Sequence, residues 1–374
     1  MENTHINSSS KFVASQSDFQ KLILILKKEN YTIIAPKVKD NAIIYDEIVS
    51  AEDLPIGIKD KQEKGKYFIE KTSSGKYFDF VVGPNSLKNY FFPTEKIIFK
   101  AVKNKNGFDI LEENYETKKY AFIGVRSCDL EGLKTQDKVF LNGQYKDSYY
   151  KKIRDEALII SVNCTTKADT CFCVSMNSGP ACKTGFDLSL TEIKLNPSHY
   201  FIIEVGSVMG EKIISKLKLL LATEKEISAG ENLIEQNKNN FIRNIETKNL
   251  KEKLFKNFES PIWDEIATRC LSCANCTMVC PTCFCSTVED ITDLKGENAK
   301  RISKWDSCFT IEHSYIHGGN IRSSVKSRYR QWLLHKFSYW VDQFDTFGCV
   351  GCGRCITWCP VGIDVTEEIK KITK

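Results

Sequence analysis

The chain has 374 residues, of which 42% are apolar and 27% charged, a balance typical of folded soluble proteins rather than disordered ones. Its net charge of +5 is spread without a basic block, which argues against nucleic acid as a partner. No apolar run approaches the roughly 18 residues that cross a bilayer. The start, MENTHINSSS, lacks the layout of a signal peptide, so we expect a cytoplasmic protein without a membrane span.

The first part of the chain predicts mixed helix and strand. Ser17 or Asp18 can cap a helix over residues 19–30 (FQKLILILKKEN). Short β-like runs follow it, at 31–35, 41–45 and 96–102.

A clearer β-α-β unit comes next. Residues 120–125 (YAFIGV) and 157–162 (ALIISV) have the pattern of buried strands, and Asp129 can cap a helix between them. Such a unit implies parallel strands. Cys128 and Cys164 follow the two strands, and ligands of open α/β sheets lie beyond the carboxyl ends of strands. We therefore expect both thiols to face one crevice.

A domain boundary is expected near residue 255. A strand-like patch at 200–206 and a helical stretch at 214–227 precede it. Residues 1–255 are predicted to form an α/β domain with a partly parallel sheet and an additional cluster site. Residues 256–374 are predicted to form a mainly helical, two-cluster ferredoxin-like domain, which makes the whole chain α+β.

Sixteen cysteines, none before residue 128, fall into groups. Five lie at 128–182, six at 270–285, one at 308 and four at 349–359. Disulfides are rare in a reducing cytosol. Grouped cysteines are typical of inorganic sites, because several thiolates must converge on one centre.

One spacing, C-x2-C-x2-C-x3-C-P, occurs twice, ending at Pro281 and Pro360. It is the run of two-cluster ferredoxins, in which the fourth cysteine ligates the other cluster. Zinc is the alternative for a lone C-x2-C, and the duplicated run argues against it. The predicted ligands of cluster site 1 are Cys270, Cys273, Cys276 and Cys359. Those of cluster site 2 are Cys280, Cys349, Cys352 and Cys355. About seventy residues separate the runs, so we expect a helical variant of the ferredoxin module.

Longer stretches around these motifs resemble a known family. They are RCLSCANCTMVCPTCFC at 269–285, KWDSC at 304–308, GCVGCGRCITWCP at 348–360, GVRSCDLEGL at 124–133 and NCTTKADTCFCVSMNSGP at 163–180. They resemble the iron–sulfur β subunit of cytosolic nickel–iron hydrogenases (sulfhydrogenases) and the corresponding iron–sulfur component of anaerobic sulfite reductases. The resemblance covers most of the chain from about residue 85.

The resemblance implies an electron-transfer subunit. In that family a flavoprotein subunit oxidises NAD(P)H, and another subunit holds the nickel–iron or siroheme centre. This chain has no G-x-G-x-x-G after a strand and no P-loop, in agreement with nucleotide and flavin being bound elsewhere. The family has histidine after a glycine pair, where this chain has Asn320, so no role is carried over to that position. We see no catalytic constellation. The alternative function is a self-contained thiol, disulfide or sulfur reductase using the N-terminal cysteine crevice.

Four cysteines upstream also match the family and suit a third 4Fe–4S cluster: Cys128, Cys164, Cys171 and Cys173. Cys182 could replace Cys171 or Cys173. The alternative is a set of buried or redox-active thiols without metal.

Three further cysteines, Cys283, Cys285 and Cys308, do not complete a four-thiolate site. His313 or His317 could supply a fourth ligand, because a four-residue spacing puts both on one helix face. In the simpler alternative, Cys283 and Cys285 line the edge of cluster site 1, Cys308 packs behind it, and the histidines lie at the surface.

Overall fold

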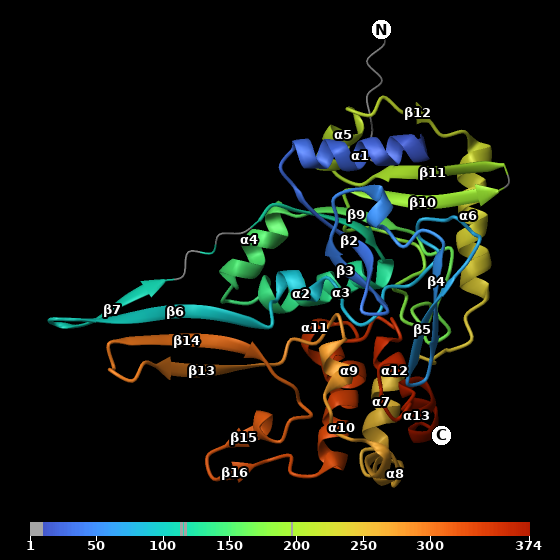
Figure 1. Ribbon diagram of the computed structural model, residues 1–374. Coiled ribbons are helices and arrows are strands. Elements are labelled where there is room, and N and C mark those ends of the chain that lie inside the picture. Colours follow the sequence, from blue (N-terminus) through green and yellow to red (C-terminus); the bar gives the residue numbers. More distant parts are fainter. Residues whose placement is uncertain (1–9, 113–114, 116–117, 196) are drawn as a thin grey trace.

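The computed structural model (Figure 1) describes residues 10–112, 115, 118–195 and 197–374. The prediction that the chain lacks a signal peptide depends mostly on residues 1–9, which lie outside the described residues. The chain combines an eight-stranded sheet, a four-stranded sheet and a C-terminal group of short helices. It is α+β, as predicted. None of the helices in the described ranges is long and apolar enough to span a membrane.

The eight-stranded sheet has a parallel centre. Its order is β12-β1-β11-β10-β9-β8-β2-β3, in which β10, β9, β8 and β2 run parallel to one another. The predicted strands are present. The bounds are β1 (Lys11–Ser15), β2 (Thr32–Lys39), β3 (Ala42–Glu47), β8 (Tyr120–Val125), β9 (Leu158–Val162), β10 (Leu188–Leu195), β11 (Ser198–Val205) and β12 (Leu220–Leu221).

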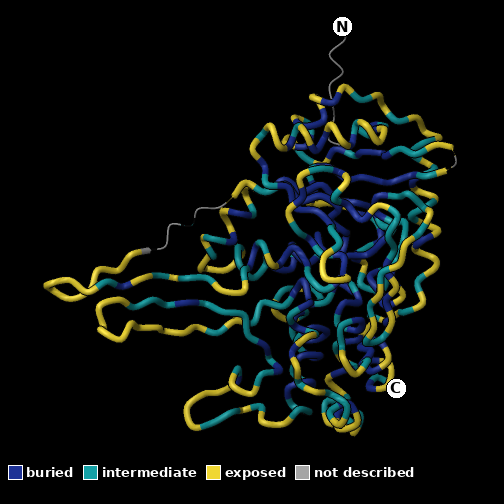
Figure 2. Tube along the Cα trace, in the orientation of Figure 1, coloured by how far each residue is buried: buried dark blue, intermediate teal, exposed yellow. Residues whose placement is uncertain are grey.

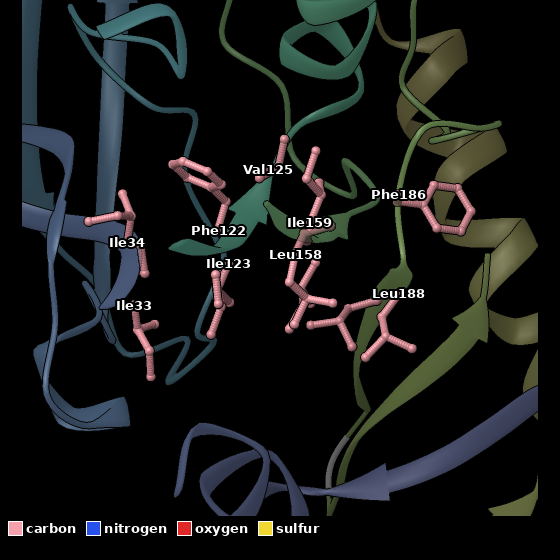
Figure 3. Close-up of a cluster of buried hydrophobic side chains, with 14 of the residues drawn as sticks. Ile33, Ile34, Phe122, Ile123, Val125, Leu158, Ile159, Phe186 and Leu188 are labelled. Atoms are coloured by element: carbon pink, nitrogen blue, oxygen red, sulfur yellow. The ribbon is translucent and has the colours of Figure 1, made fainter. Parts of the chain in front are cut away.

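Strands β8 and β9 are buried along almost their whole length because both faces of the sheet are covered. Phe122, Ile123 and Val125 of β8 lie beside Leu158 and Ile159 of β9 (Figure 3), and all five are buried. This arrangement fixes the two strands whose carboxyl ends lead to Cys128 and Cys164.

Helices accompany the sheet, and three details differ from expectation. The bounds are α1 (Gln16–Lys28), α3 (Ser127–Phe140), α4 (Ser148–Glu156), α5 (Val208–Ile214) and α6 (Glu224–Asn239). Ser15, in a capping box with Asp18, caps α1, so the predicted caps were wrong. Asp129 lies inside α3 and does not cap it. The stretch 214–227 is helical only in part, because β12 pairs with β1 before α6 begins.

The C-terminal helices share a second core. It includes Trp263, Trp332, Phe337 and Ile369. The bounds are α7 (Leu250–Lys256), α8 (Ile262–Arg269), α9 (Asn275–Met278), α10 (Val325–Leu334), α11 (Trp340–Phe344), α12 (Arg354–Thr357) and α13 (Val365–Ile372), with a π-helical turn, η3 (His335–Tyr339), between α10 and α11. Phe172 and Leu250 from before residue 255 also belong to this core. The boundary near 255 stays a prediction.

The segment between the two cysteine runs is only partly helical. Its strands β13 (Ser286–Thr292) and β14 (Asn298–Trp305) join β6 (Glu95–Asn104) and β7 (Gly107–Glu112) in the order β13-β14-β6-β7. This sheet extends away from the body of the molecule (Figure 1), and much of it is exposed (Figure 2). The expectation of a helical insert was therefore incomplete, because β14 pairs with a strand contributed by the N-terminal region.

Short elements complete the described chain. They are η1 (Ala51–Asp53), β4 (Ile58–Glu63), β5 (Lys66–Lys71), α2 (Lys88–Phe91), η2 (Glu312–Ser314), β15 (Tyr315–Ile316) and β16 (Gly319–Asn320).

Candidate metal centres

One cavity is lined by five cysteines from both runs. They are the set predicted for cluster site 1, Cys270, Cys273, Cys276 and Cys359, together with Cys355. The remaining wall is mostly apolar, with Phe309, Tyr329, Trp332, Ile363 and Val365 among its residues. Cys273 is exposed, so this cavity approaches the protein surface.

A second cavity is lined by the other four cysteines. They are Cys280, Cys349, Cys352 and Cys355, the set predicted for cluster site 2. Cys355, Trp332 and Val365 line both cavities. The two sites are therefore neighbours, separated by a shared wall.

The two cysteine loops have the same backbone course. Ser272 and Ala274 have φ of 51° and 66°, and Gly351 and Gly353, at the same positions of the second run, have φ of 63° and 78°. The amide of Ser272 points at the sulfur of Cys270 (3.4 Å), and that of Gly351 at the sulfur of Cys349 (3.4 Å). Amide groups directed at sulfur stabilise thiolate ligands.

The donor set fits 4Fe–4S clusters. Each cavity gathers the four thiols predicted for it, with Cys355 of site 2 also reaching the first cavity. Amides face two of the sulfurs, and aromatic and aliphatic side chains form the walls. Iron–sulfur clusters in proteins are held by such sets of four cysteines. The assignment of individual ligands stays a prediction.

Glycine is required in the second loop because another segment packs directly on it. A Cβ atom at Gly353 would lie 2.4 Å from the carbonyl oxygen of Thr170, and one at Gly351 would lie 2.7 Å from the amide nitrogen of Cys173. Phe172 donates its amide to the Gly351 carbonyl (2.8 Å). The loop 170–173 thus covers cluster site 2 from the side of the eight-stranded sheet.

A buried lysine faces cluster site 2. Lys336, on the π-helical turn, is 6% exposed and places Nζ 3.2 Å from the sulfur of Cys280. Burial disfavours its charged form, but the charges of Cys280, Cys283 and Cys349 outweigh that cost and hold the pKa of Lys336 well above its ordinary value. The ammonium is thus a fixed positive charge beside a predicted ligand.

We expect Lys336→Met to lower the midpoint potential of the cluster at site 2, because a nearby positive charge favours the more negative, reduced state. An EPR-monitored redox titration measures the shift. Lys326→Met is the matched control, since Lys326 pairs with Asp264 at the surface (2.8 Å). Equal midpoint potentials of the site 2 cluster in Lys336→Met and Lys326→Met would contradict this effect of the Lys336 charge.

The upstream cysteines lie together next to cluster site 2. Cys173 is within electrostatic range of Cys164, Cys171 and Cys352, and Cys128 is within range of Cys173 and Cys352. The sulfur of Cys171 lies 3.6 Å from the carbonyl oxygen of Cys352. These four upstream residues, Cys128, Cys164, Cys171 and Cys173, are called the third cysteine group.

A buried arginine accompanies the third cysteine group. Arg126, 1% exposed, donates to the carbonyls of Phe78 (3.0 Å) and Phe80 (2.6 Å) and places Nη1 3.9 Å from the sulfur of Cys164. Its Nε has no hydrogen-bond partner among the described residues. A buried guanidinium of this kind offsets negative charge on the thiolates nearby, so the surroundings fit a charged metal centre. Cys182 directs its sulfur at the Val162 carbonyl (3.7 Å).

A buried ion pair joins the two regions. Arg354, between Gly353 and Cys355, makes two contacts with the carboxylate of Asp129, at 2.9 and 3.1 Å. The side chains are only 2% and 0% exposed. Asp129 is the third residue of α3, past the N-cap position of Arg126, and its carboxylate pairs with Arg354.

Cys283, Cys285 and Cys308, which belong to neither predicted cluster site, contact other cysteines or a histidine. Cys283 contacts Cys280, and Cys285 contacts both Cys308 and His313. His317 is exposed. Among the described residues, no group of three or more His, Cys, Asp or Glu side chains is arranged to hold a single metal ion.

Sequence reasoning missed Lys336, Trp332 and Arg354. A four-residue spacing places Trp332 and Lys336 on one helix face, and a lysine within the apolar stretch WLLHKFSYW is a signal of a buried charge. Arg354 had no such signal, because its partner Asp129 lies more than two hundred positions away.

The comparisons agree with this chemistry. A family model described as a 4Fe-4S dicluster domain matches residues 269–363. The chain is thus an iron–sulfur electron-transfer subunit that carries 4Fe–4S clusters. It is 33% identical over 293 residues to sulfhydrogenase 2 subunit beta of Pyrococcus furiosus, a match that covers 76% of this chain and 82% of that protein. No solved structure matches. The chain belongs to the family of sulfhydrogenase β subunits, the hydrogenase branch of the resemblance seen in the sequence.

Proposed function

We propose that this chain carries electrons between an NAD(P)H-oxidising flavoprotein and a catalytic subunit in a cytoplasmic complex. The observation that carries the proposal is the pair of adjacent cavities, lined by five and four cysteines and sharing Cys355 and Trp332. Clusters held there supply one-electron redox chemistry when bound. The cysteines hold iron, and the apolar walls exclude water, which helps to set the potential.

The catalytic partner we propose is a nickel–iron hydrogenase subunit. The support is the relative's name, sulfhydrogenase 2 subunit beta, together with its coverage of most of this chain. A siroheme sulfite reductase subunit is the other partner implied by the sequence resemblance.

Anaerobic purification of the tagged chain from its native cells tests this proposal. We expect a flavoprotein and a nickel-containing subunit to co-purify, and NAD(P)H to bleach the cluster absorbance only in the complex. A siroheme protein in their place would identify the sulfite reductase alternative. Hydrogen consumption or sulfite reduction by the isolated chain would contradict a purely electron-carrying role.

We also propose that the third cysteine group holds a third 4Fe–4S cluster, so the anaerobically reconstituted chain should contain about twelve irons. Cys171→Ala should lower this to about eight, as measured by iron analysis. Cys182→Ala should keep about twelve, because the sulfur of Cys182 is directed at the Val162 carbonyl. The reverse pattern would make Cys182 the ligand, and about eight irons in the unmodified chain would rule out the third cluster.

A further inference from the structure

Two of the leftover thiols touch each other beside the predicted clusters. Cys285 and Cys308 are hydrogen-bonded through their sulfurs. The Asp306 amide donates to the Cys285 carbonyl (2.9 Å), which fixes the two backbone segments side by side. Thiols already in contact need only a small movement to form a disulfide.

A histidine and an aspartate continue a chain of hydrogen bonds that starts at Cys285 of this thiol pair. His313 is hydrogen-bonded to Cys285 and places Nδ1 2.7 Å from the Asp306 carboxylate. Asp306 is itself held by the amide of Ser307 (2.7 Å) and the hydroxyl of Thr310 (2.6 Å). A nucleophile, a base and a group that orients the base form the arrangement that activates cysteine in unrelated proteins.

We propose that Cys285 and Cys308 form a thiol–disulfide exchange site that reduces external disulfides, with His313 as proton carrier and Asp306 as its positioning residue. Cys285 is the attacking thiolate and Cys308 the resolving thiol. The site is distinct from the N-terminal cysteine crevice and from both cluster sites.

The surroundings favour a thiolate at Cys285. Contact with Cys308 and His313 lowers the pKa of Cys285 to about 4 despite burial. Contact with Cys285 and then Asp306 raises the pKa of His313 to about 9, also against burial. The other titratable groups within electrostatic range of the thiol pair are Cys276, Cys283, His335, Lys88 and Lys336. A thiolate paired with an imidazolium is the reactive form of cysteine.

The site is open to solvent on the η2 side. Cys285 and Cys308 are half-buried, and the side chain of His313 is 25% exposed. Ile311 and Tyr315, on either side of His313, are 54% and 64% exposed. In the proposed reaction the disulfide substrate approaches Cys285 from this side.

The reaction balances in two halves. The Cys285 thiolate attacks a disulfide RSSR, giving a mixed disulfide and RS⁻, which takes a proton from the His313 imidazolium and leaves as RSH. The neutral His313 then accepts the proton of the Cys308 thiol, and the Cys308 thiolate displaces the second RS⁻ and closes the Cys285–Cys308 bond. The second RS⁻ leaves as RSH with a proton from solvent. Two electrons and one proton return the pair to thiol and thiolate. The clusters proposed for this subunit supply those two electrons, so this step of the inference rests on the proposed function.

A trapping experiment on the cluster-loaded chain tests the exchange site, with oxidised glutathione as the probe. In the unmodified chain, peptide mass spectrometry should find a Cys285–Cys308 disulfide. In Cys308→Ser it should find glutathione on Cys285, because the resolving thiol is missing. Glutathione distributed equally over Cys182, Cys283 and Cys285, or absent from Cys285, would overturn the proposal.

A pair of histidine variants tests the proton carrier. His313→Gln should slow glutathionylation of Cys285 in the Cys308→Ser background about tenfold at pH 7, since an ordinary thiol is only a few per cent ionised there. Its rate should recover as the pH rises. His317→Gln, at an exposed position of the same segment, should leave both rate and pH profile unchanged. Identical profiles for the two variants would remove His313 from the site.

The source of electrons is tested separately. The clusters of the dithionite-reduced, desalted chain should lose two electron equivalents for each molecule of oxidised glutathione added, as measured by their absorbance. The clusters of the Cys285→Ser variant should stay reduced. Dithiothreitol should regenerate the Cys285–Cys308 pair of the unmodified chain whether or not the clusters deliver electrons. Regeneration by dithiothreitol without cluster oxidation would count against electron delivery alone, whereas failure of the trapping experiment would count against the exchange site.

Discussion

Cys359→Ala is expected to remove the cluster at site 1, although Cys359 belongs to the other cysteine run. Cys359 lines the same cavity as Cys270, Cys273 and Cys276 of the first run, and the fourth cysteine of such a run ligates the other cluster. Iron content should fall by about four per chain. EPR of the dithionite-reduced variant should retain the signal of site 2.

A double variant identifies which cluster is lost. Lys336 faces Cys280 of site 2, so the potential shift caused by Lys336→Met should persist in the Cys359→Ala background. In the reciprocal variant Cys280→Ala, that shift should vanish together with the cluster. The shift should also persist in Cys270→Ala. Its loss in that variant would mean that each run holds its own cluster, because Cys280 would then share a cluster with Cys270.

Asp129→Ala should destabilise the protein strongly, by about 3–5 kcal/mol, because it leaves the Arg354 guanidinium buried without its partner. Arg354 lies within the loop of cluster site 2, so cluster absorbance and secondary structure should be lost at a lower denaturant concentration. Circular dichroism and absorbance, followed anaerobically, measure both.

Two variants control this experiment. Asp290→Ala breaks the exposed pair with Arg301 and should change the stability little, because solvent screens an exposed ion pair. Asp129→Leu combined with Arg354→Met should recover most of the loss, since apolar residues can replace a buried ion pair. An Asp129→Ala variant as stable as Asp290→Ala would show that the buried pair contributes little.

Local patterns were enough to predict the sheet strands. The runs at 120–125 and 157–162 each combine buried, β-branched residues with a following loop, and both became parallel strands. The duplicated cysteine run also indicated which thiols converge, since its spacing reflects the shape of a loop around one centre.

Contacts between distant segments could not be predicted in this way. Nothing near Gly353 indicates that Thr170 packs against it, and nothing near β14 indicates its pairing with β6. The cap of α1 was misplaced because Ser15 and Ser17 are both suitable caps and only Ser15 forms the box with Asp18. Distances between residues far apart in the chain decide these features.

The packing of residues 170–173 on Gly351 and Gly353 has a consequence for how the protein matures. That loop covers site 2 from the sheet side, whereas site 1 has an exposed ligand in Cys273. Iron and sulfide delivered after folding therefore have a shorter route to site 1. We expect biogenesis to follow an order in which site 2 is filled before the sheet domain closes over it, with site 1 accepting its cluster last.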